Sequence, residues 1–426
     1  MNPRELLEAS FRAAIAAADP LKVVPPHLPA PPEGRTLVLA VGKAACGMAL
    51  AVERHWPAGK PLYGIALTRY GHARPLERMH YYEASHPLPD RAGEQASREM
   101  LSAATALRSA DLLLALISGG GSALLALPAE GISVEDLRQV TRELLACGAT
   151  IQEINAVRKH LSAIQGGRLA AACRTNVLAL IISDVTGDDP THIASGPCAP
   201  DPTTFQDAVD VLNRYDIRPP RAVLEHLVAG VRGEREETPK PGDPVFERVK
   251  NRVIASAQHS LAAAAQVFRG AGIAPVILGD SVTGEAREVA KVMAALVRQV
   301  RMRAEPFKPP VALISGGECT VTLRAKGGRG GRCGEFLLSL AIELAGPSGV
   351  YAIAADTDGL DGTEDNAGAL LAPDTLARAQ ARGADARKLL AANDSYGFFS
   401  ALGDVVVTGP TGTNVNDYRA ILVLPD

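Results

Sequence analysis

Short, unbroken runs of apolar residues alternate with amphipathic segments along most of the chain. The clearest run, Leu112–Ile117, is followed by Ser118, three glycines, Ser122 and a further apolar stretch. A short apolar run bounded by glycine is typical of a strand buried on both faces. Three glycines permit a sharp turn and a close approach of the backbone to a ligand. A strand, a glycine loop and a helix N-terminus together favour anion binding, although a simple tight turn explains one such loop equally well.

The same pattern recurs in the second half of the chain, where the run Val311–Ile314 is followed by Ser315, two glycines and Glu318. Two such segments predict two α/β domains that each present a loop at the carboxyl end of a strand, where open α/β sheets bind ligands. A length of 426 residues also favours two domains. The polar, glycine- and proline-rich segment 230–244 marks the expected boundary. We predict a Rossmann-like, parallel-sheet domain over residues 1–238 and a second α/β domain over residues 239–426.

The other apolar and amphipathic segments complete the expected order of elements. Buried strands are predicted at residues 36–41, 62–67, 112–117, 177–182, 274–278, 350–355 and 420–424. Helices are predicted at residues 2–18, 91–110, 134–147, 152–169, 206–230, 259–270, 284–303 and 335–345.

Composition narrows the class of protein. Hydrophobic residues make up 47% of the chain and charged residues 21%, which is ordinary for a soluble globular protein. A net charge of -3 gives no electrostatic support for nucleic-acid binding, and 4% aromatic residues argue against a stacking surface. Six scattered cysteines without a CxxC pair indicate neither a disulfide framework nor a zinc site. With no signal peptide and no apolar stretch that could span a membrane, we expect a cytoplasmic monomer or homodimer without nucleic-acid or membrane partners.

Lys43 directly follows the first predicted strand and lies inside the turn that leads to the next helix. Gly42 and Gly47 have the GxxxxG spacing of a phosphate loop, but Met48-Ala49 replaces the required Lys-Ser or Lys-Thr, which excludes a Walker A motif. A lysine in this turn is poorly placed for packing and well placed to meet an anion.

Two further basic residues are candidates for ligand contacts. His86 lies in the loop 85–90, where it acts either on a ligand or as a structural loop residue. Lys159 lies in the amphipathic segment 152–169, whose other cations are Arg158, His160 and Arg168. A solvated basic face and a phosphate-facing patch both remain open for this segment.

Acidic side chains follow several predicted strands. Asp184 and Asp189 come after the strand 177–182, and hard oxygen ligands at a strand end suit Mg²⁺ when phosphates complete its shell. An aspartate-rich turn that caps the next helix is the structural alternative. Glu318 and Asp356 follow strands of the second half. Arg332 precedes the helix 335–345, where a cation is unfavourable unless an anion binds there.

Together these positions favour phosphoryl transfer, which needs cations around the moving phosphoryl group and carboxylates for Mg²⁺. A dinucleotide-binding dehydrogenase would need the GxGxxG fingerprint after a strand. The loop at Gly119 does not fit this fingerprint, because Leu124 stands where the last glycine belongs.

Eight motifs resemble those of the glycerate 2-kinase family, whose members carry a C-terminal MOFRL domain. They are VGKAA at 41–45, SHPLPD at 85–90, LISGGGSALL at 116–125, RKHLSAIQGGRLA at 158–170, SDVTGDDPTHIASGP at 183–197, ISGGE at 314–318, DTDGLDG at 356–362 and TGPTGTNVND at 408–417. The resemblance implies phosphorylation of D-glycerate at its 2-hydroxyl by ATP with Mg²⁺. It also implies an active site in the cleft between the two domains and a MOFRL region at about residues 310–420.

The resemblance also implies roles for individual residues. The family's lysine and glycine-loop arginine correspond to Lys43 and Arg332, which would neutralise charge on the phosphoryl group or on the glycerate carboxylate. Many relatives read GGRNQE where this chain has Cys333-Gly334 in place of Asn-Gln, so contacts made by that pair are in doubt.

The remaining candidates complete a kinase hypothesis. The nucleotide phosphates would be bound by Ser118, Gly119, Gly120, Gly121, Ser122 and Lys159. Asp184, with Asp189, would hold Mg²⁺, and Asp184 would also serve catalysis. The substrate would be positioned by Glu318, Asp356 and His86.

Two alternatives remain open. One is an NAD(P)H-dependent hydroxypyruvate reductase, because relatives often carry that name. The other is a non-catalytic phosphosugar-binding protein, which would bind its ligand without turnover.

Overall fold

The computed structural model describes residues 2–325 and 327–425, which form two compact units. The parallel-sheet unit comprises Pro20–Ile254, and the mixed-sheet unit comprises Met1–Asp19 and Ala255–Asp426. This division differs from the expected boundary at residue 238, because the segment from 239 to 254 contains an edge strand of the first sheet. A strand belongs to the sheet that completes its backbone hydrogen bonds. The glycine- and proline-rich segment that precedes this strand in the sequence does not indicate which sheet that is.

The parallel-sheet unit is built on six strands in the order β3-β2-β1-β4-β5-β6. The strands are β1 (Thr36–Val41), β2 (Leu62–Arg69), β3 (His80–Ala84), β4 (Leu112–Ser118), β5 (Asn176–Ile182) and β6 (Val249–Ala255). Parallel pairing joins β3, β2, β1, β4 and β5. This is the strand order of doubly wound nucleotide-binding folds, and its direction of growth reverses between β1 and β4. The predicted Rossmann-like, parallel-sheet architecture is thus confirmed.

Helices on and beside this sheet connect the strands. They are α2 (Pro20–Val23), α3 (Ala45–His55), α4 (Arg91–Thr105), α5 (Gly121–Leu124), α6 (Val134–Ala146), α7 (Ile151–His160), α8 (Arg168–Ala171), α9 (Phe205–Arg214) and α10 (Arg221–Val231), with short 3₁₀ turns η1 (Pro25–His27), η2 (Ile193–Ser195) and η3 (Pro244–Arg248). Two predicted helices are divided. The segment 152–169 breaks after His160, before the glycine pair 166–167, and the segment 206–230 breaks before Pro219-Pro220. Both breaks follow from residues that interrupt helical geometry.

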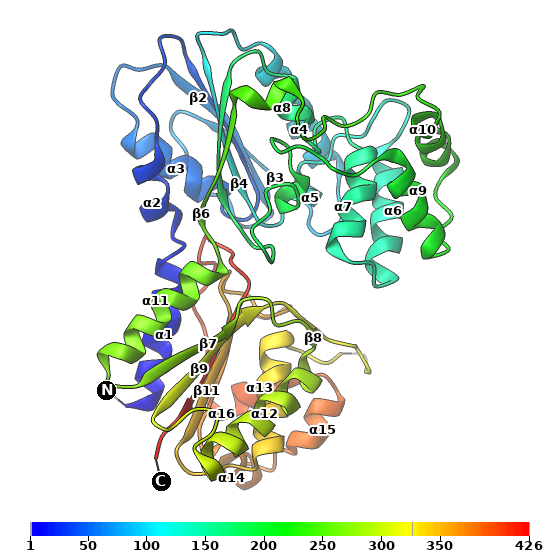
Figure 1. The fold of residues 1–426 in the computed structure, drawn as a ribbon. Coiled ribbons are helices and arrows are strands. Elements are labelled where there is room, and N and C mark those ends of the chain that lie inside the picture. Colours follow the sequence, from blue (N-terminus) through cyan, green and yellow to red (C-terminus); the bar gives the residue numbers. More distant parts are fainter. Residues whose placement is uncertain (1, 326, 426) are drawn as a thin grey trace. The chain divides into compact units, whose positions relative to one another are not determined.

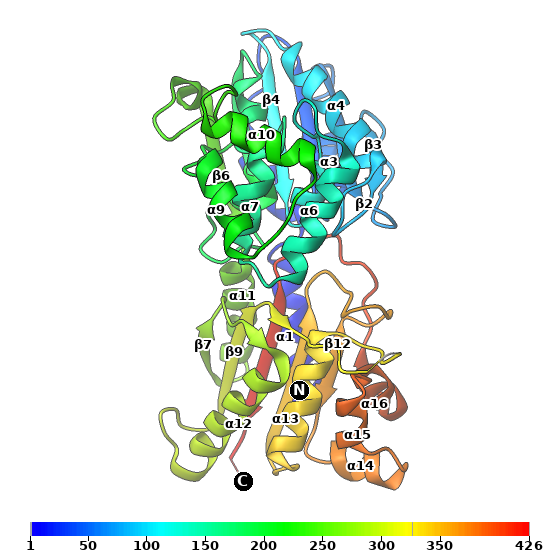
Figure 2. The same ribbon diagram turned by 90° about the vertical axis from the view of Figure 1, so that its right-hand side faces the viewer.

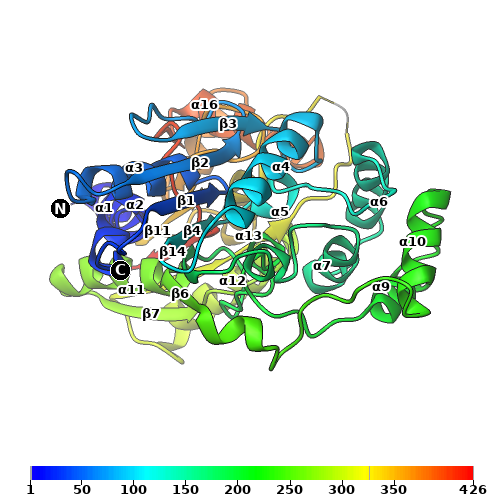
Figure 3. The same ribbon diagram turned by 90° about the horizontal axis from the view of Figure 1, so that it is seen from above.

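Four of these helices, α6, α7, α9 and α10, form a group of their own beside the sheet (Figures 1 and 3). They enclose a separate apolar core that includes Leu144, Val157, Phe205 and Leu227. This helical group holds α7, which carries the basic run of residues 158–160.

The mixed-sheet unit contains a second six-stranded sheet in the order β13-β12-β11-β14-β9-β7. Its strands, with the small pair β8 and β10, are β7 (Ala274–Gly279), β8 (Gly284–Glu285), β9 (Val311–Gly317), β10 (Cys319–Thr320), β11 (Val350–Asp356), β12 (Gly368–Leu371), β13 (Val405–Val406) and β14 (Asp417–Val423). Its helices are α1 (Pro3–Ala16), α11 (Ala257–Gly270), α12 (Ala286–Arg303), α13 (Arg332–Leu344), α14 (Thr375–Ala381), α15 (Ala386–Ala391) and α16 (Ser395–Leu402). Over the described residues, no helix combines the length and the apolar character needed to cross a membrane.

Two apolar cores lie on the two faces of this sheet. Helices α1 and α11 pack on one face through residues such as Phe11 and Phe268, and α12 and α13 pack on the other through residues such as Val297 and Phe336. Figure 2 shows α12 and α13 side by side over their face. The first helix of the chain therefore completes the mixed-sheet unit, although its sequence position suggests the other one.

The second Ser-Gly-Gly segment does not form the loop that the sequence predicts. β9 continues through Ser315 and Gly316 to Gly317, which pairs antiparallel with Asp417 of β14. Four of the five pairings in this sheet are antiparallel, and only β7 and β9 run parallel. The expectation of two equivalent strand-end loops was wrong, because pairing with β14 extends the strand through the glycines.

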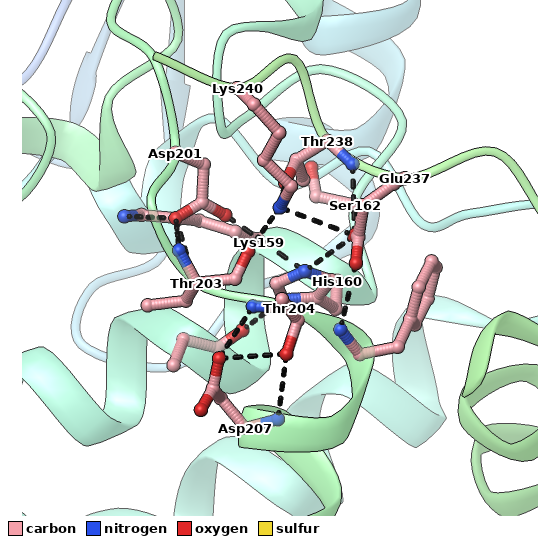
Figure 4. A network of polar contacts seen from close by, with 12 residues as sticks. Lys159, His160, Ser162, Asp201, Thr203, Thr204, Asp207, Glu237, Thr238 and Lys240 are labelled. Atoms are coloured by element: carbon pink, nitrogen blue, oxygen red, sulfur yellow. Dashed lines mark hydrogen bonds and ion pairs between the residues drawn. The ribbon is translucent and has the colours of Figure 1, made fainter.

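A buried polar network ties α7 to the segment around residue 237 (Figure 4). The Lys159 Nζ donates to Thr191 Oγ1 at 2.9 Å and to Asp201 Oδ1 at 3.2 Å, and Lys159 and Asp201 are both 0% exposed. The His160 Nε2 lies 2.9 Å from Glu237 Oε1, while Nδ1 lies 2.7 Å from the carbonyl of its own helix at residue 156. Unsatisfied charges would be costly at such sites, so these pairs hold the two segments in place.

Glu237→Gln should weaken the parallel-sheet unit in a pH-dependent way. Burial alone would raise the pKa of Glu237, but hydrogen bonds from His160 and from the Thr238 and Phe205 N–H groups lower it to about 2. A lowered carboxyl pKa stabilises the fold above the unfolded value of about 4.5, and this contribution is lost as the pH falls toward 2. We expect a loss of about 1–2 kcal/mol at pH 7, allowing for solvent screening of the partly exposed side chain.

The measurement is urea unfolding followed by tryptophan fluorescence, because the single tryptophan, Trp56, lies in the parallel-sheet unit. The stability difference between the wild type and Glu237→Gln should shrink between pH 5 and pH 3. The exposed Glu234→Gln is the matched control and should behave as the wild type. A difference that stays constant over this pH range would contradict the assignment.

Candidate functional site

The sequence-predicted residues of the first half gather at the carboxyl edge of the parallel sheet. In the parallel register, Val41 pairs with Ile117, Arg69 with Ala84, and Ser118 with Ile182. The turns that follow β1, β3, β4 and β5 therefore begin at one edge. These turns carry Lys43, His86, the glycine loop 118–122, and Asp184 with Asp189, in that order. This edge, at the point where the strand order reverses, is the ligand-binding edge of open α/β sheets.

The turn after β1 and the turn after β4 are directly joined. The Lys43 N–H donates to the Gly119 carbonyl at 2.9 Å. The buried Ser118 hydroxyl donates to the Val41 carbonyl at 3.2 Å and accepts the Ala44 N–H at 3.1 Å. The Ser118 side chain thus links the two turns by hydrogen bonds. Because its hydroxyl is occupied in this way, any phosphate contact from Ser118 would come from its backbone.

Close packing at this junction requires glycine. Gly42 has a φ of +117°, and a Cβ there would lie 2.3 Å from the Ser118 Oγ. A Cβ at Gly120 would lie 3.3 Å from both the Lys43 Cγ and the His86 Nε2. The structure therefore brings Lys43 and His86, two of the sequence-predicted candidates, together over the glycine loop. Both side chains keep part of their surface exposed.

The end of the glycine loop is held by side chains that the sequence analysis did not select. The Gln165 Nε2 donates to the Ser122 carbonyl at 2.8 Å, and the Ser195 Oγ lies 2.9 Å from both Ser122 Oγ and Asn155 Oδ1. Asn155 and Gln165 carry a weak signal in the sequence, since they are amides among apolar positions. The helix that follows, α5, has only four residues, so its dipole adds little to anion binding.

Asp184 and Asp189 lie in the turn after β5, next to the glycine loop. Asp184 is half-buried, and Asp189 is exposed and accepts the Thr191 N–H at 3.0 Å. Within residues 2–325 and 327–425, no cluster of three or more His, Cys, Asp or Glu side chains forms a metal centre. One or two carboxylates at a strand end fit Mg²⁺, which keeps most of its shell for water and phosphate oxygens.

Lys159 lies near Asp189, because its ammonium donates to Thr191, whose N–H donates to Asp189, but the Lys159 side chain is fully buried. Its ammonium lies in the buried network with Asp201 and Thr191, so its charge already has a protein partner. The neighbouring Arg158 is half-buried, and its guanidinium has no ion pair or hydrogen bond to any residue that the structure describes. Sequence alone did not separate two adjacent cations of one helix, because their environments depend on which face of α7 is covered.

Arg332 is the first residue of α13 in the mixed-sheet unit, and its guanidinium binds three carboxylates. Nε donates to Asp417 Oδ1 at 2.7 Å, Nη1 to Glu318 Oε1 at 2.6 Å, and Nη2 to Asp356 Oδ2 at 2.8 Å. Three of the residues predicted for this half, Arg332, Glu318 and Asp356, therefore meet. Asp417 was missed as a site residue, although it ends the motif TGPTGTNVND.

The electrostatics of this cluster keep Arg332 cationic. Burial alone would lower the pKa of Arg332, but Asp417, Asp356 and Glu318 together raise it far above its usual range. Asp417 also accepts from Arg419 Nη2 at 2.8 Å, so one carboxylate bridges two arginines. Glu318 differs from its partners because 55% of its side chain is exposed, against 5% for Asp356 and 0% for Asp417. Glu318 is therefore the carboxylate of this cluster that a ligand can reach.

The Cys333-Gly334 pair sits at the start of α13 behind Arg332. Both N–H groups donate to the buried Asp361 carboxylate, at 3.0 Å and 2.8 Å. A Cβ at Gly334 would lie 2.6 Å from the Ser395 Oγ, so a longer side chain there would require Ser395 to move.

Comparison with known proteins identifies the family of this chain. A model described as a domain of unknown function, DUF4147, matches residues 6–228, and the MOFRL family model matches residues 311–417. A protein of Agrobacterium vitis that is provisionally named hydroxypyruvate reductase is 50% identical over 99% of this chain and 95% of its own length.

Two further relatives carry kinase names. The glycerate 2-kinase of Pyrococcus horikoshii is 42% identical over 92% of this chain and 88% of its own length. A solved structure described as glycerate kinase from Thermotoga maritima is 38% identical, covers 99% of each chain and has a TM-score of 0.87. The chain belongs to the glycerate 2-kinase family with a C-terminal MOFRL region.

Proposed function

We propose that the protein transfers the γ-phosphoryl group of ATP to the 2-hydroxyl of D-glycerate and releases 2-phosphoglycerate and ADP. The observation that carries this proposal is the meeting of Lys43 with the glycine loop at the reversal point between β1 and β4. A cation beside backbone donors at this edge suits the phosphates of a nucleotide. The kinase names of relatives at about 40% identity support glycerate as the acceptor.

The parallel-sheet unit would bind the nucleotide phosphates. Backbone N–H groups of residues 119–122 would face the phosphates, and Lys43 would offset the charge that spreads over the phosphoryl oxygens. His86, packed over the same glycine, would contact the substrate. Asp184 and Asp189 would hold Mg²⁺, which when bound neutralises phosphate charge. Lys159 is left out of this proposal, because its ammonium is fully buried against Asp201.

In the mixed-sheet unit, Arg332 and Glu318 would meet the reactants. Arg332 keeps its positive charge at every working pH, which suits a group that stabilises the transferring phosphoryl. Glu318, with its exposed carboxylate, would orient the glycerate hydroxyl. Asp356 is buried against Arg332, so we assign it the positioning of that arginine rather than a substrate contact. Catalysis would then consist mainly of positioning and charge neutralisation.

The reductase alternative rests on the name of the Agrobacterium relative. The turn after β1 is where a dinucleotide-binding fold carries its GxGxxG fingerprint. In this chain the middle position of that fingerprint is Ala44, whose N–H is used by Ser118. The turn therefore lacks the glycine that lets a pyrophosphate approach, which favours the kinase. A cytoplasmic location and a monomeric or homodimeric state stay predictions.

Lys43→Ala should lower kcat at least 100-fold with little effect on folding, because removing one preorganised cation from a transition state costs about 10²–10³ in rate. Lys60→Ala is the matched control, since Lys60 is exposed and precedes β2 at the opposite edge of the sheet. Steady-state kinetics with D-glycerate and ATP, together with a urea unfolding curve, make the comparison. Near-normal turnover of Lys43→Ala would exclude the proposed role.

Arg332→Ala should destabilise the mixed-sheet unit as well as stop turnover. Removal of the guanidinium leaves Asp417 and Asp356 buried without their partner, and breaking a buried pair costs about 3–5 kcal/mol. Circular dichroism should therefore show a lower unfolding midpoint than for Arg329→Ala, which removes a half-exposed pair with Asp394. An unchanged midpoint would show that the three carboxylates do not depend on Arg332.

The reaction itself is tested by phosphorus NMR of the product formed from D-glycerate, ATP and Mg²⁺. We expect the signal of 2-phosphoglycerate. A 3-phosphoglycerate signal would keep the kinase and reject the 2-hydroxyl as acceptor. Oxidation of NADH by hydroxypyruvate, with no phosphorylated product, would establish the reductase instead.

A further inference from the structure

Arg158 of α7 is a partly buried cation without a protein partner in the described chain. No ion pair or hydrogen bond links its guanidinium to residues 2–325 or 327–425, and burial alone lowers the pKa of this arginine to about 10. Three other buried or partly buried arginines have carboxylate partners: Arg287 with Glu335, Arg332 with three carboxylates and Arg419 with Asp417. Arg168 donates to backbone carbonyls instead. A cation held partly out of water without a counter-charge is destabilising unless a ligand supplies one.

The Arg158 side chain lines a small cavity next to the glycine loop. The cavity measures about 20 Å³ and its walls include Ser122, Ser162, Gln165 and Pro89. Ser122 is the last residue of the loop that Lys43 and His86 contact, and Pro89 belongs to the same turn as His86. The cavity therefore adjoins the proposed active site within a single unit.

Three other polar residues of this cavity, Ser122, Ser162 and Gln165, are already engaged. The Gln165 Nε2 donates to the carbonyls of Ser122 and Leu125, at 2.8 and 2.9 Å. The Ser162 Oγ accepts the N–H groups of residues 164 and 165. These bonds hold the walls in place and leave the guanidinium as the cavity's uncompensated charge. A site of this kind selects an anion with few atoms.

We infer that Arg158 binds the carboxylate of glycerate, a role that rests on the proposed function. A guanidinium presents a planar fork of donors that matches a carboxylate in two parallel hydrogen bonds. The small cavity suits a small anionic group. The glycerate carboxylate is attached to the carbon that bears the reacting hydroxyl, so holding the carboxylate orients that hydroxyl toward the phosphoryl group. Arg158 is then a substrate-binding residue that also sets specificity for a 2-hydroxy acid.

The test compares Arg158→Ala and Arg158→Lys with Arg142→Ala, an exposed arginine of α6 outside the cavity. We expect KM for D-glycerate to rise 10- to 100-fold in Arg158→Ala, with less than a threefold change in KM for ATP. Arg158→Lys keeps the charge and the aliphatic stem, so it should fold normally and recover only part of the affinity, because an ammonium cannot form the paired contact. Methylguanidinium added to Arg158→Ala should restore part of the activity and should not affect Arg142→Ala.

Three results would overturn the inference. The first is an unchanged KM for D-glycerate in both Arg158 variants. The second is a rise confined to KM for ATP, which would mean that Arg158 contacts a phosphate. The third is an absence of rescue by methylguanidinium in a folded Arg158→Ala. Calorimetric titration of D-glycerate separates this inference from the kinase proposal. A wild type that binds D-glycerate but forms no phosphorylated product would reject the kinase, while loss of that binding in Arg158→Ala would still establish the carboxylate site.

Discussion

The pairing of β1 with β4 in the middle of the parallel sheet sets the position of the residues on which the proposed chemistry depends. Because both strands end at one edge, the turn that carries Lys43 and the glycine loop after β4 must meet there. The Ser118 hydroxyl and the Lys43 N–H then join the two turns, and two glycines allow the close approach. The cation and the backbone donors are thus held before any ligand binds, which is the condition for electrostatic preorganisation.

Two arginines, one in each unit, have opposite electrostatic surroundings. In the mixed-sheet unit, Arg332 is surrounded by three carboxylates, and Asp417 links it to Arg419. The three carboxylates therefore outnumber the two guanidinium groups that they contact. In the parallel-sheet unit, Arg158 has no carboxylate beside it. An excess of carboxylates around one cation suits a hydroxyl donor or a metal-bound phosphate, whereas an unpaired guanidinium suits an anion. Buried charge needs a counter-charge, which the protein supplies to Arg332 and does not supply to Arg158.

Much of the fold could be predicted because its strands are continuous apolar runs. β1, β4 and β5 lie where such runs occur, and Lys43 and the glycine loop were identified from their places at strand ends. Lys159 was chosen in place of Arg158, because adjacent residues of one helix share a sequence pattern and differ only in what covers them. Asp417 was missed because it begins a strand as part of a motif that looks like an ordinary turn. These roles depend on contacts with residues that are far apart in sequence. Hydrophobic periodicity contains no information on such contacts.

By itself the sequence determined the local helices and strands, the polar and charged residues that follow the strands, and the family. Each of these depends on residues that are neighbours in the chain. Only the tertiary structure decided that α1 completes the mixed-sheet unit and that β6 borders the parallel sheet. It also decided that β9 runs straight through its glycines, because the backbone of β14 was there to pair with them. The physical reason is the same in each case. Burial and backbone hydrogen bonds are completed by segments that are distant in sequence, so their contribution to the free energy of folding depends on which segments meet.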